Sequence, residues 1–206
     1  MLEYLSLLTD TEKLIHYGGL SILLIIITIE TGFFFGFFLP GDPLLFTAGL
    51  LCGTKDLDVN LFILLISVTI AAFIGNVIGY STGKYVGKKL FTKTNSIFFK
   101  QHHLETTRNF YNKYGGLSLV TGRFLPIVRT FAPIFAGIIE IPFWKFNGYN
   151  ILGAFLWIWT LIPLGYFLGN QFPQLIEYIE YIIIGIVLLT SIILIKAYHQ
   201  LKPKTS

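Results

Sequence analysis

Charged residues are scarce in this chain. Asp, Glu, Lys and Arg make up 13% of its 206 residues, whereas an average soluble domain carries about 25%. Hydrophobic residues make up 54%, and the mean hydropathy is +0.70. A chain so poor in charge cannot cover its own surface with solvated groups, so its composition argues against a soluble domain and predicts an integral membrane protein.

Two further features are missing. The single cysteine, Cys52, excludes an intrachain disulfide and leaves the redox compartment undetermined. The opening stretch MLEYLSLLTDTEK has no basic region ahead of an apolar core, so we expect no cleavable signal peptide.

The apolar residues gather in six segments, 14–39, 44–52, 61–80, 117–139, 149–169 and 178–198. Segments 61–80, 149–169 and 178–198 are long enough to cross about 30 Å of hydrocarbon as helices. The other segments are interrupted by prolines, which remove a backbone donor and break a straight helix; these are Pro40, Pro43, Pro126 and Pro133. Broken backbone at membrane depth must be surrounded by protein or a wet cavity, so these prolines predict two re-entrant hairpins.

The chain also repeats itself in a fixed order. YGGLS occurs at 17–21 and 114–118, Phe-Leu-Pro at 38–40 and 124–126, and Ala-Gly at 48–49 and 136–137. Gly83 and Gly87 recur 82 positions later as Gly165 and Gly169. We interpret these matches as two repeats, about 17–87 and 114–169, each a hairpin followed by one transmembrane helix.

One net crossing per repeat would invert the second copy relative to the first. Seven of the fifteen basic residues lie between Lys84 and Lys113; beside long apolar segments, such a run favours a cytoplasmic loop over nucleic-acid binding. The expected fold is an all-α, multi-pass integral membrane protein with one membrane domain, 1–206. Two inverted-topology repeats precede a C-terminal transmembrane helix at 178–198, with segment 84–113 and the C-terminus cytoplasmic. Segment 90–113 mixes aromatics with bases and predicts an amphipathic interfacial helix.

Arg123 and Arg129 stand in the apolar stretch GRFLPIVRTFAPIFAG. An arginine at the centre of a membrane helix costs about 2.5–3.5 kcal/mol. One interpretation is that both side chains snorkel to the interface. On an unbroken helix they would point about 240° apart, but a break at Pro126 would let them converge on one buried site.

Two acids, Glu30 and Asp42, occupy the equivalent part of the first repeat, IETGFFFGFFLPGDPLL. Asp42 could instead cap the helix that starts near Pro43, and Glu30 could lie at an interface. If the hairpins meet, the acids and the arginines would offset one another's charge. Arginine's planar fork suits phosphate, and a desolvated carboxylate beside it could carry a proton.

The pattern G-R-F-x-P-x-x-R-T followed by P-x-x-A-G, with E-x-G ahead of L-P-G-D, resembles the DedA family of bacterial membrane proteins, also called the VTT or SNARE-associated Golgi domain family. The resemblance covers residues 15–170. It implies two facing re-entrant hairpins and lipid translocation; some bacterial members are implicated in recycling undecaprenyl phosphate, and eukaryotic relatives scramble phospholipids. It places functional roles on Glu30, Asp42, Arg123 and Arg129. Leu119 departs from the family, which often has an aromatic residue there.

Two other groups of residues allow a structural or a functional interpretation. Gly75, Gly79, Gly83 and Gly87 recur every four residues, which predicts a close helix-packing face; the alternative is a hinge. Trp144, Trp157 and Trp159 are interpreted as interfacial or packing aromatics rather than a cation cage.

The leading hypothesis is therefore a lipid-phosphate flippase that moves undecaprenyl phosphate across the cytoplasmic membrane for recycling. Arg123 and Arg129 would bind the phosphate, and Glu30 and Asp42 would couple transport to protons or another cation such as sodium.

A gradient-independent phospholipid scramblase is the alternative. A lipid-phosphate phosphatase is disfavoured because no histidine lies near the arginines in sequence and no aspartate cluster could hold Mg²⁺; a non-catalytic scaffold is the remaining hypothesis. We expect no enzyme activity, cofactor, metal or nucleic-acid partner. The partners are membrane lipids, polyprenyl phosphate or phospholipid, and the glycine face would allow a homo-oligomer.

Overall fold

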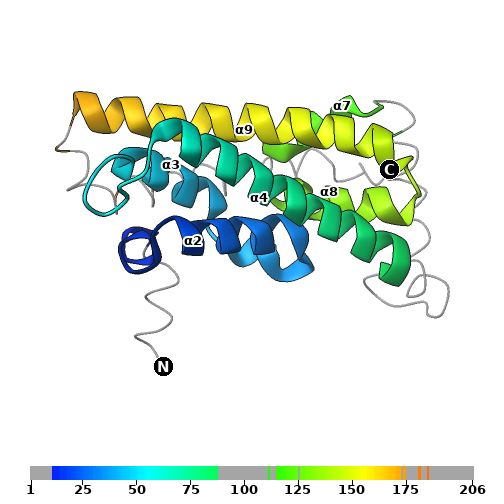
Figure 1. Ribbon diagram of the computed structural model, residues 1–206. Helices are drawn as coiled ribbons and strands as arrows, with labels where there is room; N and C mark the ends of the chain where they lie inside the picture. The colour runs from blue at the N-terminus through cyan, green and yellow to red at the C-terminus, as the bar shows by residue number, and fades with distance from the viewer. Residues whose placement is uncertain are drawn as a thin grey trace, which may run out of the picture.

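The computed structural model describes residues 11–87, 111, 115–124, 126–172, 174, 181 and 185, and helices form its regular elements (Figure 1). In chain order these are α2 (Thr11–Gly32), η1 (Phe34–Phe38), α3 (Gly41–Leu51), α4 (Leu61–Thr82), η2 (Gly83–Gly87), α7 (Leu117–Thr121), η3 (Gly122–Phe124), α8 (Pro126–Ile138) and α9 (Phe143–Gln171). Apart from isolated positions, the predicted helix 178–198 and the predicted interfacial segment 90–113 lie outside the described residues.

Two helices are long and apolar enough to cross a membrane, α4 with its η2 extension (Leu61–Gly87) and α9. They run in opposite directions, α4 from its cyan to its green end and α9 from its yellow to its orange end (Figure 1). Only 39% and 33% of their most apolar stretches are buried within the protein. The core helix of a soluble protein would be mostly buried, so these exposed apolar faces favour contact with lipid.

Helix α4 has one exposed apolar side and one buried side. Its exposed isoleucines recur at helical spacing and are each about half exposed; they are Ile63, Ile66, Ile70 and Ile74. The opposite side, which includes Leu64 and Val68, is buried within the protein, where α4 packs mainly against α2, α8 and α9. Asn60 caps the first turn, because its side-chain oxygen accepts from the backbone N–H of Phe62 at 2.9 Å.

Helix α9 begins at Phe143, six residues before the predicted segment 149–169. Pro142 lies at its N-cap, where a missing N–H costs nothing. Lys145 and Asn147 in the first turns lowered the apolar character of this part of the sequence, which is why the segment was predicted to start later.

The prolines do not all break helices. Pro40 lies at the N-cap of α3 and Pro126 is the first residue of α8, as the sequence predicted for helix breaks. Pro43 instead lies in the first turn of α3, where its missing donor has no helical acceptor to lose. The predicted helix break at Pro133 is wrong. This proline lies inside α8, which continues to Ile138, so it removes one backbone donor without ending the helix.

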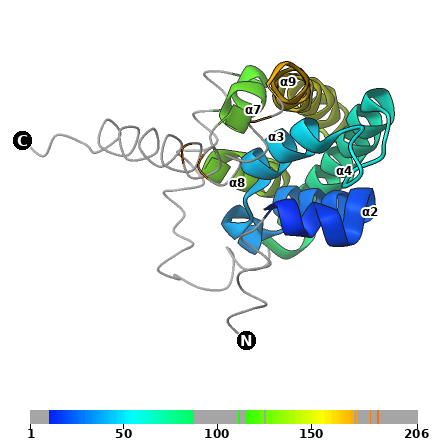
Figure 2. The same ribbon diagram turned by 90° about the vertical axis from the view of Figure 1, so that its left-hand side faces the viewer.

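The first segment, 14–39, is a helix with an interruption. Gly19 has φ 51° and ψ −144° inside α2, a conformation that suits glycine. The chain then passes through the short 3₁₀ turn η1 into α3. Figure 2 looks along the long helices and places α3 among α2, α4 and α9, and one buried apolar core contains residues from all four.

Close glycine contacts join each short helix to the long helix of the other predicted repeat. A Cβ atom at Gly49 in α3 would collide with the backbone carbonyl oxygen of Ile162 in α9. A Cβ atom at Gly137 in α8 would likewise collide with the carbonyl oxygen of Tyr80 in α4. The glycines are 88 positions apart and the carbonyls 82, which are the spacings of the two Ala-Gly pairs and of Gly83 and Gly165 in the repeated sequence.

A second pair of contacts follows the same rule. A Cβ at Gly165 would meet the carbonyl oxygen of Phe46, and a Cβ at Gly83 would meet that of Ile134. The predicted packing face of α4 is confirmed, because Gly75 lies against α2 while Gly83 and Gly87 lie against α8. These glycines are therefore occupied within the chain and do not form a free surface for self-association.

Candidate functional site

One arginine bridges two acids from α2 and α3. Arg129, in the first turns of α8, donates from Nη2 to Glu30 Oε1 on α2 and from Nη1 to Asp42 Oδ1 on α3. Arg129 is 3% exposed and Glu30 is 1% exposed. Helix α8 thus meets the two neighbouring helices α2 and α3, which are distant from it in sequence, at a single guanidinium. The side chains do not reach an interface as snorkelling would require.

Asp42 does not cap α3. The N-cap of that helix is Pro40, with no side-chain cap bond, and Asp42 lies in the first turn. An acid there interacts favourably with the helix dipole, while its carboxylate is directed to Arg129. The capping interpretation is therefore wrong, and the first turn of α3 presents Asp42 to Arg129 of α8.

Gly41 makes room for Glu30. A Cβ atom at this position would overlap the Glu30 carboxylate, so a larger residue would push Glu30 away from Arg129. The sequence offered one signal for this role, since Gly41 immediately precedes Asp42 in LPGD.

Trp157 of α9 completes the cluster. Its indole Nε1 donates to Asp42 Oδ1 at 2.8 Å, and its ring centroid lies 4.0 Å from Arg129 Cζ. A desolvated guanidinium over an indole ring gains about 2 kcal/mol. Trp157 is 2% exposed, unlike Trp144 at 84%, so the interpretation of Trp157 as a mere packing aromatic is corrected: it contacts both an acid and an arginine.

Arg123 has a different environment. It donates from Nη1 to the backbone carbonyl oxygen of Asn150 at 3.0 Å and from Nη2 to Asn150 Oδ1 at 2.8 Å. Within the described residues, no carboxylate lies within ion-pair distance of it. Arg123 is therefore held by the neutral Asn150 rather than by a direct ion pair, with its side chain 4% exposed, and the acids offset its charge only from a distance.

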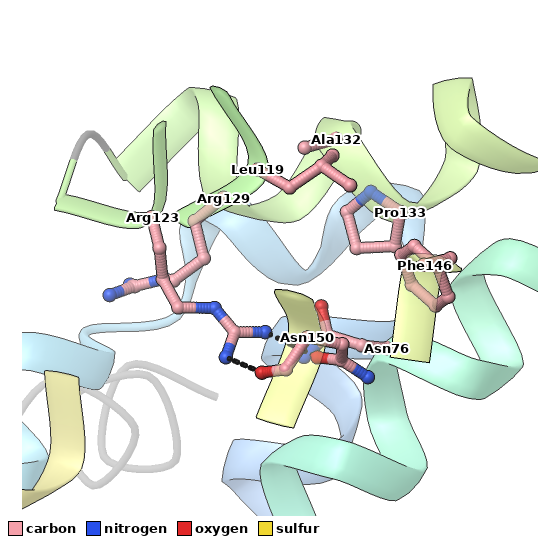
Figure 3. Close-up of a pocket in the computed structure, with 8 residues that line it drawn as sticks. All are labelled: Asn76, Leu119, Arg123, Arg129, Ala132, Pro133, Phe146 and Asn150. Atoms are coloured by element: carbon pink, nitrogen blue, oxygen red, sulfur yellow. Dashed lines mark hydrogen bonds between the residues drawn. The ribbon is translucent and has the colours of Figure 1, made fainter. Parts of the chain in front are cut away.

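The arginines and several polar groups line one small cavity (Figure 3). Its walls come from α4, α7, η3, α8 and α9; the lining residues are Asn76, Leu119, Arg123, Arg129, Ala132, Pro133, Phe146 and Asn150. Its free space suffices for about one water molecule. Pro126 therefore does let the two arginines converge on one site, although each has its own hydrogen-bond partners.

The buried site balances its charges. Glu30 and Asp42 offset Arg123 and Arg129 if all four are ionised, so the cluster as a whole is neutral. A buried ion pair is costly to desolvate, and removing one partner leaves an uncompensated charge. In the part of the chain that the structure describes, no three His, Cys, Asp or Glu residues lie together as a metal site would need.

A bundle of helices with apolar outer faces around a buried cluster of charges defines an integral membrane protein with an intramembrane polar site. The VTT domain model matches residues 39–167. The protein DedA of Escherichia coli K12 is 39% identical over 181 residues, which cover 87% of this chain and 82% of the relative. The chain therefore belongs to the DedA family, as its arginine and acid motifs predicted.

Other relatives are also membrane proteins by name. An uncharacterized membrane protein of Mycobacterium leprae is 41% identical over 177 residues, covering 85% of this chain and 78% of the relative. The inner membrane protein YqjA of Escherichia coli K12 is 29% identical over 174 residues, covering 84% and 78% respectively. No solved structure matches the chain.

Proposed function

We propose that this protein is a lipid-phosphate transporter that moves undecaprenyl phosphate across the cytoplasmic membrane for recycling, coupled to protons or another cation. The observation that carries the proposal is the buried guanidinium of Arg129 held by Glu30 and Asp42 where α2, α3 and α8 meet. Carboxylate and phosphate oxygens are alternative partners for the same planar fork. The acids therefore occupy Arg129 when no phosphate is bound.

The reciprocal glycine contacts support an inverted-repeat transporter. Each short helix packs on the long helix of the other repeat, through glycines that occupy matching positions. Broken helices that meet near the membrane midplane are typical of secondary transporters, which work by rocking one repeat against the other. In this transporter, η1–α3 and η3–α8 are the re-entrant arms that open to opposite sides of the membrane.

The coupling of phosphate binding to proton uptake follows from the charge balance of the site. The four ionised groups sum to zero, and a phosphate that enters this buried site adds at least one negative charge. Uptake of a proton by Glu30 removes one negative charge and releases a face of Arg129 for the phosphate. Proton binding and phosphate binding then assist each other, as linkage requires.

The structure corresponds to a closed state in this scheme. The cavity between the arginines has room for about one water molecule, so a whole phosphate headgroup requires the hairpins to separate. The apolar lipid tail stays outside, along the exposed faces of the long helices.

The proposed orientation places segment 84–113 and the C-terminus in the cytoplasm. Lys84 Nζ lies 5.9 Å from the ring centroid of Tyr85, which is 68% exposed at the end of η2. A lysine and an aromatic at the end of an apolar helix are typical of the membrane interface, and lysine favours the cytoplasmic side.

A transport assay tests the coupling. In proteoliposomes that contain undecaprenyl phosphate, an imposed pH gradient is expected to accumulate the headgroup in one leaflet, and an ionophore that collapses the gradient is expected to abolish the accumulation. Glu30→Gln keeps the side-chain shape without the titrating group, so this variant should no longer respond to the pH gradient. Equilibration at the same rate with and without gradients of protons and sodium would instead identify a scramblase, and release of inorganic phosphate by the protein alone would identify a phosphatase.

A further inference from the structure

Two buried asparagines in the long helices lie beside the arginines, and each is oriented by a partner. Asn76 of α4 donates from Nδ2 to the carbonyl oxygen of Ala72 at 2.6 Å. Asn150 of α9 accepts from Arg123 at Oδ1. Their side-chain amides therefore have assigned directions, with Asn76 Oδ1 left as an acceptor and Asn150 Nδ2 left as a donor.

Both of these remaining atoms are buried without a hydrogen-bond partner in the protein. Asn76 is 0% exposed and Asn150 is 4% exposed, and both residues line the same cavity (Figure 3). A buried polar atom without a partner costs about 1–3 kcal/mol. A buried polar atom of this kind is accounted for by an ordered water, an ion or a functional role.

The size and polarity of the cavity identify the chemical group that fits. The space holds about one water molecule, that is, one oxygen atom with its hydrogens. An oxygen in this space that contacts both atoms accepts from Asn150 Nδ2 and donates to Asn76 Oδ1, so it carries a proton. Water meets this requirement in the resting state, and the P–OH group of a singly protonated phosphate meets it when lipid is bound.

We propose that Asn76 and Asn150 form a hydroxyl-recognition subsite that selects phosphate monoesters over phosphodiesters. The inference rests on the proposed function, since the arginines must first hold the phosphate beside the cavity. A monoester monoanion has a P–OH that donates to Asn76 Oδ1. A diester has no such proton, and it would leave Asn76 Oδ1 facing an oxygen that can only accept. Ordinary diester phospholipids, the bulk of a membrane, would thereby be rejected.

A matched pair of lipids tests the subsite without altering the protein. Phosphatidic acid is a monoester, and phosphatidylmethanol is the same lipid with the P–OH methylated. We would measure the binding of each to the full chain in phosphatidylcholine nanodiscs at about pH 5.5, where both lipids carry roughly one negative charge because the second phosphate pKa is near 6. Phosphatidic acid is expected to bind roughly tenfold more tightly or better, which is the effect of one buried hydrogen-bond mismatch.

The protein-side variant is Asn76→Leu, which removes the acceptor at similar volume. It should abolish the preference, because phosphatidic acid loses a hydrogen bond and phosphatidylmethanol no longer faces an unmatched acceptor. Asn147→Leu is the matched control, because Asn147 is also buried with an unpaired Oδ1 but does not line the cavity; this variant should keep the preference.

The outcomes separate this inference from the proposed function. Equal binding of the two lipids by the unaltered chain, or a preference that survives Asn76→Leu, overturns the hydroxyl subsite while lipid-phosphate binding stands. Binding of both lipids that is insensitive to Arg129→Leu, or no binding of either, overturns the proposed function and this inference together.

Discussion

Replacement of Arg129 by leucine is expected to lower the free energy of unfolding by about 3–5 kcal/mol, because it leaves Glu30 and Asp42 buried without their counter-ion. The triple variant Arg129→Leu, Glu30→Gln, Asp42→Asn removes the charges together and keeps the shapes of the acids. It should recover part of the lost stability, because no acid is then left without its counter-ion and neutral groups in place of a buried ion pair are often no less stable. Arg123 keeps its charge in this variant and its hydrogen bonds to Asn150.

Reversible unfolding in mixed micelles, with the three proteins side by side, measures this difference. Lys145→Leu serves as the control for loss of one cation, because Lys145 lies on the exposed first turn of α9 and should change the unfolding free energy by less than about 0.5 kcal/mol. A single Arg129→Leu variant as stable as the unaltered chain would contradict the buried ion-pair cluster, as would a triple variant no more stable than the single one.

The second large effect is expected at the glycine contacts between the repeats. Gly49→Ala and Gly137→Ala would each place a Cβ atom against a backbone carbonyl of the opposite long helix, at Ile162 and Tyr80. Backbone cannot turn aside as a side chain can, so each variant should lose about 3 kcal/mol, the upper range for overpacking. Because the two contacts are equivalent in the repeat, the two losses should be similar.

Gly148→Ala is the matched control for these variants. Gly148 lies in α9, is exposed, and would present its Cβ to open space, with nothing within 4 Å. Alanine there should be neutral or stabilising by up to about 1 kcal/mol, which is the helix propensity difference. If Gly49→Ala or Gly137→Ala behaved like Gly148→Ala in the same unfolding experiment, the close crossing of that helix pair would be refuted.

Much of this arrangement could be predicted from the sequence because its signals are strong. Long apolar runs predict α4 and α9. The start of α9 is predicted too late because its first turns contain polar residues. The regular glycine spacing in α4 predicted a packing face. Because charges are costly in an apolar chain, the sequence alone assigns Glu30, Asp42, Arg123 and Arg129 to one site. In the structure both arginines line one cavity, and Arg129 pairs with both acids.

The neutral members of the site could not be found in the same way. Trp157 resembles any interfacial or packing aromatic until its indole is placed beside Asp42 and Arg129. Asn76 and Asn150 carry no charge, so they do not stand out in an apolar sequence as the ionisable residues do. An amide within an apolar helix is the available signal. Which partner each arginine takes depends on the crossing of distant helices, and that is a property of the tertiary fold.

The most direct test of the central claim is headgroup exposure in proteoliposomes that contain undecaprenyl phosphate, measured with a membrane-impermeant phosphatase added outside. The unaltered chain is predicted to render accessible the pool of the inner leaflet as well as that of the outer leaflet. The triple variant Arg129→Leu, Glu30→Gln, Asp42→Asn, at equal protein level and with comparable stability, is predicted to leave the inner pool protected. Equal exposure of the inner pool by the triple variant and the unaltered chain would contradict a transport site built on Arg129 and its two acids.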